Sequence, residues 1–168
     1  MCLTFVFVNP DPQKDGNNEY KLILAFNREE RLDRPTAKAD WWPDQTIFGG
    51  RDLVTGGTWL AADVRGRVAF VTNIQEPGTS IRNPVLTRGS LVVDFLSQDS
   101  LDAEAFMEKL MEEIALNEMK AFNFCIMEPK KNLNGYETFM LSHFANQSFL
   151  MKIDNHSFGV CNNPFIES

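Results

Sequence analysis

Apolar side chains recur along the chain with two different periods. In residues 101–119 they fall at helical spacing, which predicts an α-helix with one face toward a core. Residues 87–96 show the same spacing, and Thr87 is suited to cap that helix. The acidic residues of the longer helix fall on its other face, where we expect them to be solvated. Its core-facing stripe is predicted to be Ala103, Phe106, Met107, Leu110, Met111 and Ile114.

The other apolar runs are short and rich in Val, Ile and Phe, which is typical of strands. The first two, residues 1–8 and 20–26, flank a polar turn and are expected to pair antiparallel. Residues 36–45 and 76–84 are predicted to be loops. The order of strands, helices and strands indicates an α+β domain in which antiparallel sheet packs against helices. Further strands are predicted at 58–63, 67–73, 121–127, 136–144, 147–153 and 158–164.

The composition narrows the class of protein. A length of 168 residues with 43% hydrophobic residues suits a single domain with a core. The net charge of −7 argues against duplex nucleic acid and anionic membrane as partners. No apolar run approaches the roughly 20 residues of a membrane span, and the N-terminus lacks the basic region of a signal peptide. Cys2, Cys125 and Cys161 form no CxxC pair, which argues against a disulfide framework or a metal site and favours a reducing compartment.

A candidate site follows from the pairing of the first two strands. That pairing returns the end of the second strand to Cys2, so a thiol, a guanidinium and two carboxylates would share one rim of a sheet. A nearby guanidinium favours the reactive thiolate. In the other interpretation Cys2 is a small buried residue and the charges lock the strands together. The tetrapeptide concerned is Asn27, Arg28, Glu29 and Glu30.

The arginines suggest an anionic ligand. All eight lie between Arg28 and Arg88, and arginine binds carboxylates and phosphates through two parallel hydrogen bonds. Ordinary pairing with surface acids is one interpretation, and a pocket for an anion is the other. Trp41 and Trp42 are expected either in the core or at the rim of that pocket. The candidate ligand-binding residues are Asn27, Arg28, Arg31, Arg34, Trp41, Trp42, Arg51 and Arg88.

Several motifs taken together resemble the NRDE family, whose animal members are called transport and Golgi organisation protein 2. The resemblance runs from residue 1 to about residue 164 and implies one domain over 1–168 with the N-terminal nucleophile hydrolase fold, a sandwich of two antiparallel sheets between helix layers. Glu29 departs from the family, which has aspartate there. Family members usually continue roughly a hundred residues further, far more than a tail, so we expect the C-terminal part of the domain to be missing. The motifs are Met1-Cys2, Asn27-Arg28-Glu29-Glu30, Arg34-Pro35-Thr36, Gly56-Gly57-Thr58-Trp59-Leu60 and Thr72-Asn73.

The resemblance implies a protein that binds and hands over haem, or a similar hydrophobic anion such as an acyl-CoA, in the cytoplasm in association with mitochondria or Golgi. Haem would be cargo, and no other cofactor is implied. Two alternatives stay open: a hydrolase of amides or thioesters with an N-terminal cysteine, and a non-catalytic factor in Golgi organisation and secretion. His143 and His156, the only histidines, are expected at strand ends or on the surface rather than on iron.

The hydrolase alternative assigns roles through a more distant resemblance to bile-salt and penicillin hydrolases. Removal of Met1 would free the α-amine of Cys2 to act as base for its own thiolate. We expect Met1 to be retained and find no equivalent of the late arginine of those hydrolases, which favours a structural Cys2. Cys125 and Cys161 are expected in the core. The implied catalytic set is Cys2 as nucleophile, Arg28 beside the thiolate, Glu29 or Glu30 on the α-ammonium, and Asn73 and Asn162 at the oxyanion.

Overall fold

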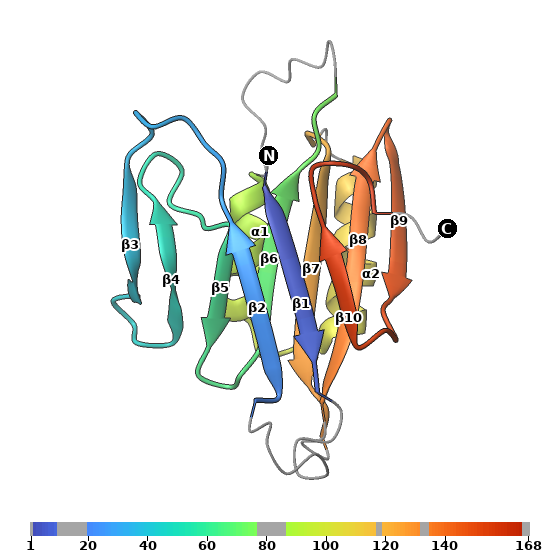
Figure 1. Cartoon of the computed structure of the whole chain (residues 1–168). Coiled ribbons are helices and arrows are strands. Elements are labelled where there is room, and N and C mark those ends of the chain that lie inside the picture. Colours follow the sequence, from blue (N-terminus) through green and yellow to red (C-terminus); the bar gives the residue numbers. More distant parts are fainter. Residues whose placement is uncertain (1, 10–19, 77–86, 117–118, 132–134, 166–168) are drawn as a thin grey trace.

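The computed structural model describes residues 2–9, 20–76, 87–116, 119–131 and 135–165. Two antiparallel sheets of these residues are stacked, and two helices cover the far face of the larger sheet (Figure 1). The smaller sheet has the order β10-β1-β2 and the larger the order β3-β4-β5-β6-β7-β8-β9. The elements are β1 Leu3–Val8, β2 Leu22–Asn27, β3 Thr36–Trp41, β4 Ile47–Asp52, β5 Leu60–Asp63, β6 Val68–Asn73, α1 Arg88–Ser97, α2 Ala103–Leu116, β7 Phe122–Pro129, β8 Tyr136–Phe144, β9 Gln147–Lys152 and β10 Ser157–Val160.

The stacking creates two apolar interfaces. One lies between the sheets and includes Val6, Phe70 and Met140. The other lies between the larger sheet and the helices and includes Leu91 and Phe124. The predicted α+β class is confirmed, because antiparallel sheet packs on helices in this way. None of the described helices is long and apolar enough to cross a membrane.

Both predicted helices are present. Thr87 caps α1 by accepting a hydrogen bond from the Ser90 amide, as the sequence indicated. The predicted stripe of α2 faces the sheet: Met107 and Leu110 are buried, and Phe106 packs against the same core. Helical periodicity was a sufficient signal here because one face of each helix is buried and the other is wet.

The predicted pairing of the first two strands is confirmed. In the antiparallel register Leu3 lies opposite Asn27 and Val8 lies opposite Leu22. Every second residue of β1 points into the interface between the sheets, as shown by buried Val6. The register therefore brings the residue before β1, which is Cys2, next to the chain that leaves β2.

The prediction of a loop over 36–45 is wrong for its first half. Residues Thr36–Trp41 form β3, the edge strand that pairs with β4, and β4 was itself not predicted. Most of β3 is exposed, so its sequence lacks the apolar alternation that marks a half-buried strand. The predicted loop over 76–84 and the polar turn over 9–18 lie almost wholly outside the described residues.

Close approach of two backbones requires glycine at position 57. A Cβ on Gly57 would come within 2.6 Å of the carbonyl carbon of Gly89. The Thr58 amide donates to the Gly89 carbonyl oxygen at 3.1 Å. The first turn of α1 therefore sits directly against the chain that enters β5, which positions both for the site described next.

Candidate functional site

A pocket of about 240 Å³ lies at the end of the sandwich where β1 begins and β2 ends, the upper end in Figure 1. Its walls come from the ends of several elements: Cys2 before β1, Arg28 after β2, Asn73 at the end of β6 and Arg88 at the start of α1. Strand pairing and packing thus gather residues that are far apart in the sequence. The other lining residues are Glu29, Glu30, Arg34, Asp52, Thr55, Gly57, Thr58, Trp59, Val71, Thr87, Gly89 and Lys120.

The Cys2 thiol is 6% exposed and is held by the chain that leaves β2. Its Sγ accepts a hydrogen bond from the Glu29 amide at 3.4 Å and lies 3.8 Å from the Glu29 carbonyl oxygen. Burial raises the pKa of the Cys2 thiol, and this outweighs the opposing effect of the Arg28 guanidinium. A raised pKa reduces the fraction of thiolate at neutral pH and so weakens Cys2 as a nucleophile.

Arg28 is held over an aromatic ring. Its guanidinium carbon lies 4.0 Å from the centroid of the Trp59 ring, and its Nη1 donates to the Thr36 hydroxyl at 3.0 Å. A guanidinium stacked on indole is stabilised by a cation–π interaction and keeps its other donors available. In the described part of the chain Arg28 forms no salt bridge.

Arg88 places a further guanidinium in the pocket. It is half-buried at the first residue of α1, and its Nη1 donates to the Ala121 carbonyl oxygen at 3.2 Å. Burial lowers the pKa of the Arg88 guanidinium, while Glu30 and Cys2 act in the opposite direction. Arginine nevertheless stays charged, and among the described residues no carboxylate forms a salt bridge with Arg88.

The charges on the outer wall are paired. Arg34 binds Asp52 at 2.7 Å and lies 4.0 Å from Glu30. Burial acts to raise the pKa of Asp52, but hydrogen bonds from Arg34 and from the Val54 amide outweigh it and the pKa is lowered. On this wall the arginine is paired with acidic residues of the protein, as expected if the arginines only stabilise the fold. Arg28 and Arg88 form no such salt bridge among the described residues.

Two asparagines complete the surroundings of Cys2. Asn73 lines the pocket at the end of β6. Asn162 follows β10 and donates through Nδ2 to the Asn73 carbonyl oxygen, and its side chain acts to lower the pKa of the nearby Cys2 thiol. Cys2, Arg28, Glu29, Glu30, Asn73 and Asn162 are therefore brought together at one end of the sandwich.

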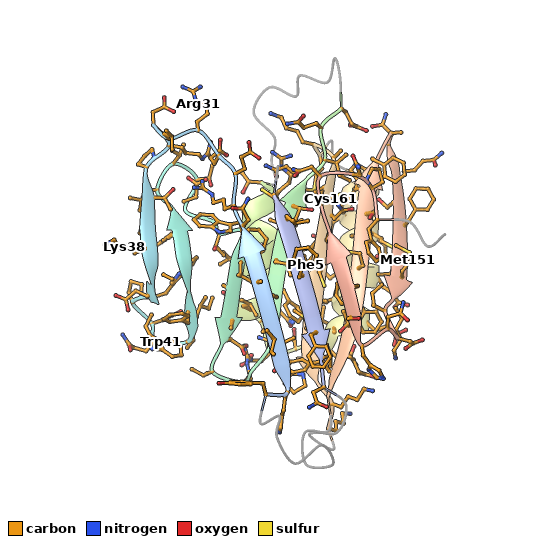
Figure 2. The ribbon with its side chains drawn as sticks, in the orientation of Figure 1. Phe5, Arg31, Lys38, Trp41, Met151 and Cys161 are labelled. Carbon is orange, nitrogen blue, oxygen red and sulfur yellow. The ribbon has the colours of Figure 1, made fainter. Side chains whose placement is uncertain are left out.

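The other predicted ligand-binding residues lie outside this pocket. Arg31 is exposed and bound to Asp33, and Trp41 packs on Phe48 at the far end of β3; Figure 2 shows both. Asn27 is exposed at the end of β2. Trp42 and Arg51 stack on each other, with the Arg51 guanidinium carbon 4.7 Å from the ring centroid.

The histidines and the remaining cysteines lie elsewhere. The His143 ring bonds to the Ser148 hydroxyl at the end of β8, and His156 is exposed. Cys125 is fully buried in β7, as expected, but Cys161 is half-buried beyond the end of β10 rather than in the core. Cys2 is therefore the only potential iron ligand among the described residues that line the pocket.

Sequence reasoning missed several lining residues. Trp59, under Arg28, stands in the Gly-Gly-Thr-Trp-Leu motif and could have been singled out there. Asp52 and Lys120 carry no local signal, because only the packing of distant strand ends brings them to the pocket.

Fold and site together define an α+β protein of two stacked antiparallel sheets with a cysteine–arginine pocket at one end. The family model described as Transport and Golgi organisation 2 matches residues 1–168, and the chain belongs to that family. It is 37% identical over 117 residues to the Homo sapiens Transport and Golgi organization protein 2 homolog and 36% identical to the one from Bos taurus, a match over 67% of this chain. It is 31% identical over 137 residues, 76% of this chain, to Transport and Golgi organization protein 2 of Drosophila melanogaster. The matches cover 41%, 41% and 46% of these relatives' own lengths, so the chain spans less than half of each.

Proposed function

We propose that the pocket binds the carboxylate or phosphate of a small metabolite between Arg28 and Arg88, and that this binding is what the protein contributes to Golgi organisation. The observation that carries the proposal is the state of these two guanidinium groups. Both line the pocket, and neither forms a salt bridge within the described residues. A cation that is partly removed from water without an anion is costly, so a bound anion would be strongly favoured there.

The start of α1 supports the same ligand. Thr87, Arg88 and Gly89 line the pocket, and the first turn of the helix contains no acidic residue. The amino end of a helix carries partial positive charge, which adds to the charge of Arg88 rather than offsetting it. An anion in the pocket would neutralise both.

The size of the pocket limits how much of a ligand can enter it. A volume of about 240 Å³ is below the roughly 300 Å³ at which pockets for drug-sized ligands begin. A small acid, or the acidic end of a larger molecule, suits this volume. Haem, the cargo implied by the family resemblance, would enter by a propionate and an acyl-CoA by a phosphate. A haem titration followed by the Soret band tests the first of these, and a spectrum that does not saturate would exclude haem from the pocket.

Isothermal titration calorimetry with phosphate, succinate and coenzyme A tests the proposal itself. At least one of the three should bind with a stoichiometry of one, and Arg88→Met should weaken that binding at least tenfold, because a hydrogen bond to a charged group contributes about 1.5–3 kcal/mol. Arg31→Met is the matched control, since Arg31 is exposed and lies outside the pocket. The proposal fails if none of the three anions binds, or if both variants weaken binding equally.

A second candidate is a hydrolase with Cys2 as nucleophile. The observation that favours it is the convergence of Arg28, Asn73 and Asn162 on Cys2. In this mechanism loss of Met1 frees the Cys2 amine, which takes the thiol proton. The thiolate then attacks an amide or thioester carbonyl, and an asparagine amide donates to the oxyanion. Collapse of the tetrahedral intermediate breaks the bond to the leaving amine or thiol, which takes the proton from the ammonium, and water then hydrolyses the acyl group from Cys2. Glu29 or Glu30 would hold the ammonium.

Mass spectrometry of the mature N-terminus is the first test of this candidate, because a retained Met1 removes the amine from the mechanism. The second test is release of free thiol from acetyl-CoA. Turnover that Cys2→Ser abolishes, with calorimetric anion binding unchanged, would establish the hydrolase. Turnover that persists in Cys2→Ser would exclude Cys2 as the nucleophile.

We further infer that residues 1–168 act as one domain of the N-terminal nucleophile hydrolase type in the cytoplasm, in association with Golgi or mitochondria. Two stacked antiparallel sheets with a cysteine at the start of β1 support the fold. The relatives' names support the role in Golgi organisation.

A further inference from the structure

A row of buried polar side chains crosses three central strands of the larger sheet. Thr72 on β6 lies opposite Asn123 on β7, which in turn lies opposite Ser142 on β8. All three are 0% exposed. Polar groups buried this deeply destabilise the fold unless they are hydrogen-bonded. The hydrogen-bond partners of these three residues therefore indicate what they do in the structure.

The partners are backbone atoms of the segment that follows β10, residues 161–165. Asn123 Nδ2 lies 3.1 Å from the Cys161 carbonyl oxygen and 2.8 Å from that of Asn163. Asn123 Oδ1 accepts from the Phe165 amide at 3.0 Å. The Thr72 hydroxyl donates to the Cys161 carbonyl oxygen at 2.9 Å. The row thus fixes this segment of chain to the larger sheet.

The segment carries Asn162, and its two neighbours in the chain are the residues that Asn123 holds. The Asn162 side chain donates to the carbonyl oxygen of Asn73, which lines the pocket, and it approaches the Cys2 thiol closely enough to act to lower the pKa of that thiol. β10 pairs with β1, with Val160 opposite Thr4. The segment therefore connects the smaller sheet, which carries Cys2, to the larger sheet, which carries Asn123.

We propose that Asn123, although remote from the pocket surface, is a positioning residue that holds the Asn162 amide against Cys2 and so sets the reactivity of the thiol. Asn123 acts through the carbonyl groups on either side of Asn162. A buried apolar residue could fill the same volume without fixing those two carbonyls. The inference rests on the proposed function, in which Cys2 forms part of the ligand pocket.

The test is the rate at which iodoacetamide labels Cys2, measured by peptide mapping of the whole chain from about pH 6 to pH 10 around the ionisation of a free thiol. Asn162→Ala removes a donor to the thiolate, so the midpoint should rise and labelling at pH 7 should slow about three- to tenfold, the effect of one hydrogen bond. Asn123→Ala should slow labelling similarly. The double variant should be no slower than Asn162→Ala alone, because both changes remove the same contact.

Gentler variants keep the test decisive if Asn123→Ala does not fold. Thr72→Val keeps the shape of the side chain but loses the bond to the Cys161 carbonyl, and it should raise the midpoint by less than Asn123→Ala does. Thr72→Ser, which retains the hydroxyl, should restore the original midpoint. Ile126→Val lowers stability within the core of the same strand and should leave the midpoint unchanged.

Three outcomes would overturn the proposal: an unchanged midpoint in Asn123→Ala and Thr72→Val, a lowered midpoint, or additive effects in the double variant. The first would mean that the row only fastens the chain, and the second that it only keeps Cys2 buried. Failure of the proposed function looks different. In that case anions fail to bind in calorimetry, whatever the labelling midpoint of Cys2.

Discussion

Arginines lie at both ends of helix α1, and their interactions with the protein differ between the two ends. At the carboxyl end Arg65 and Arg67 both donate to the Leu96 carbonyl oxygen, at 2.7 and 2.8 Å. Both also bind Asp63 Oδ2 at 2.8 Å. At the amino end Arg88 shares the pocket with Arg28 and forms no salt bridge among the described residues.

We infer from this difference that Arg65 and Arg67 stabilise the fold, whereas Arg88 is available to bind an anion. Cations at the carboxyl end of a helix interact favourably with its dipole, and those at the amino end do not. Buried Arg67 is matched by a fully buried carboxylate, so its charge is satisfied within the protein. Arg88 lies beside the partial positive charge of the helix amino end, so an anionic ligand would stabilise both charges. We therefore expect stability to depend on the arginines at the carboxyl end of α1 and anion binding to depend on Arg88 at its amino end.

The largest expected effect is at the carboxyl end. Asp63→Ala leaves the buried Arg67 guanidinium with only the exposed Asp99 carboxylate, 4.0 Å away, and breaking a buried pair in this way destabilises a protein by about 3–5 kcal/mol. Arg88→Met should change the free energy of unfolding by less than about 1 kcal/mol. Urea unfolding measures both. Equal losses would mean that Arg88 is as structural as Arg67 and would remove the distinction.

A substitution in the apolar core provides a reference loss of stability for comparison with these charge substitutions. Leu110 is 3% exposed in the apolar stripe of α2, so Leu110→Ala should cost roughly 2–5 kcal/mol. Glu112 lies on the exposed face of the same helix, so Glu112→Ala should stay within about 0.5 kcal/mol. The same urea experiment would contradict the orientation of α2 if the two losses were equal.

Acid should weaken the paired wall of the pocket by a smaller amount. The lowered pKa of Asp52 means that its carboxylate stabilises the fold fully above the ordinary pKa of 3.8, and that this contribution is lost as pH falls through the lower folded value. We expect about 1 kcal/mol, the upper end for an ion pair that is partly exposed to solvent. Asp52→Asn should therefore flatten the decline in stability between about pH 5 and pH 2. An unaltered decline would show that the Arg34–Asp52 pair contributes nothing.

The smallest effect concerns the thiol beside Arg28. The guanidinium acts to lower the pKa of the Cys2 thiol against the larger effect of burial, so Arg28→Ala should slow iodoacetamide labelling of Cys2 by a few-fold at neutral pH. Labelling of Cys161 in the same sample is the internal control. Faster labelling in the variant would mean that Arg28 mainly shields the thiol from reagent.

The elements that could be predicted from sequence are those with one buried face. The stripe of α2 and the alternation of β1 have that property, and the pairing that places Cys2 beside Arg28 followed from two apolar runs and a turn. Strand β3 escaped because an exposed edge strand is stabilised by backbone pairing that its side chains do not record.

The site was predictable only in part, for a related reason. Cys2, Arg28 and Arg88 stood out by residue type. Residue type alone could not distinguish Arg88 from Arg31, which binds Asp33, or from Arg51, which stacks on Trp42. That distinction depends on partners brought together by the fold. Asn123 could have been noticed in the sequence, since it is a polar residue inside an otherwise apolar strand.

We propose above that the amino end of α1 binds an anion. The most direct test is a titration of ¹⁵N-labelled protein with inorganic phosphate, followed by amide chemical shifts. We expect saturable shifts that concentrate at Gly89 and at its contact Thr58. They should be lost in Arg88→Met and retained in Arg65→Met, at the other end of the helix. Shifts that do not saturate, or that survive in Arg88→Met, would contradict this proposal.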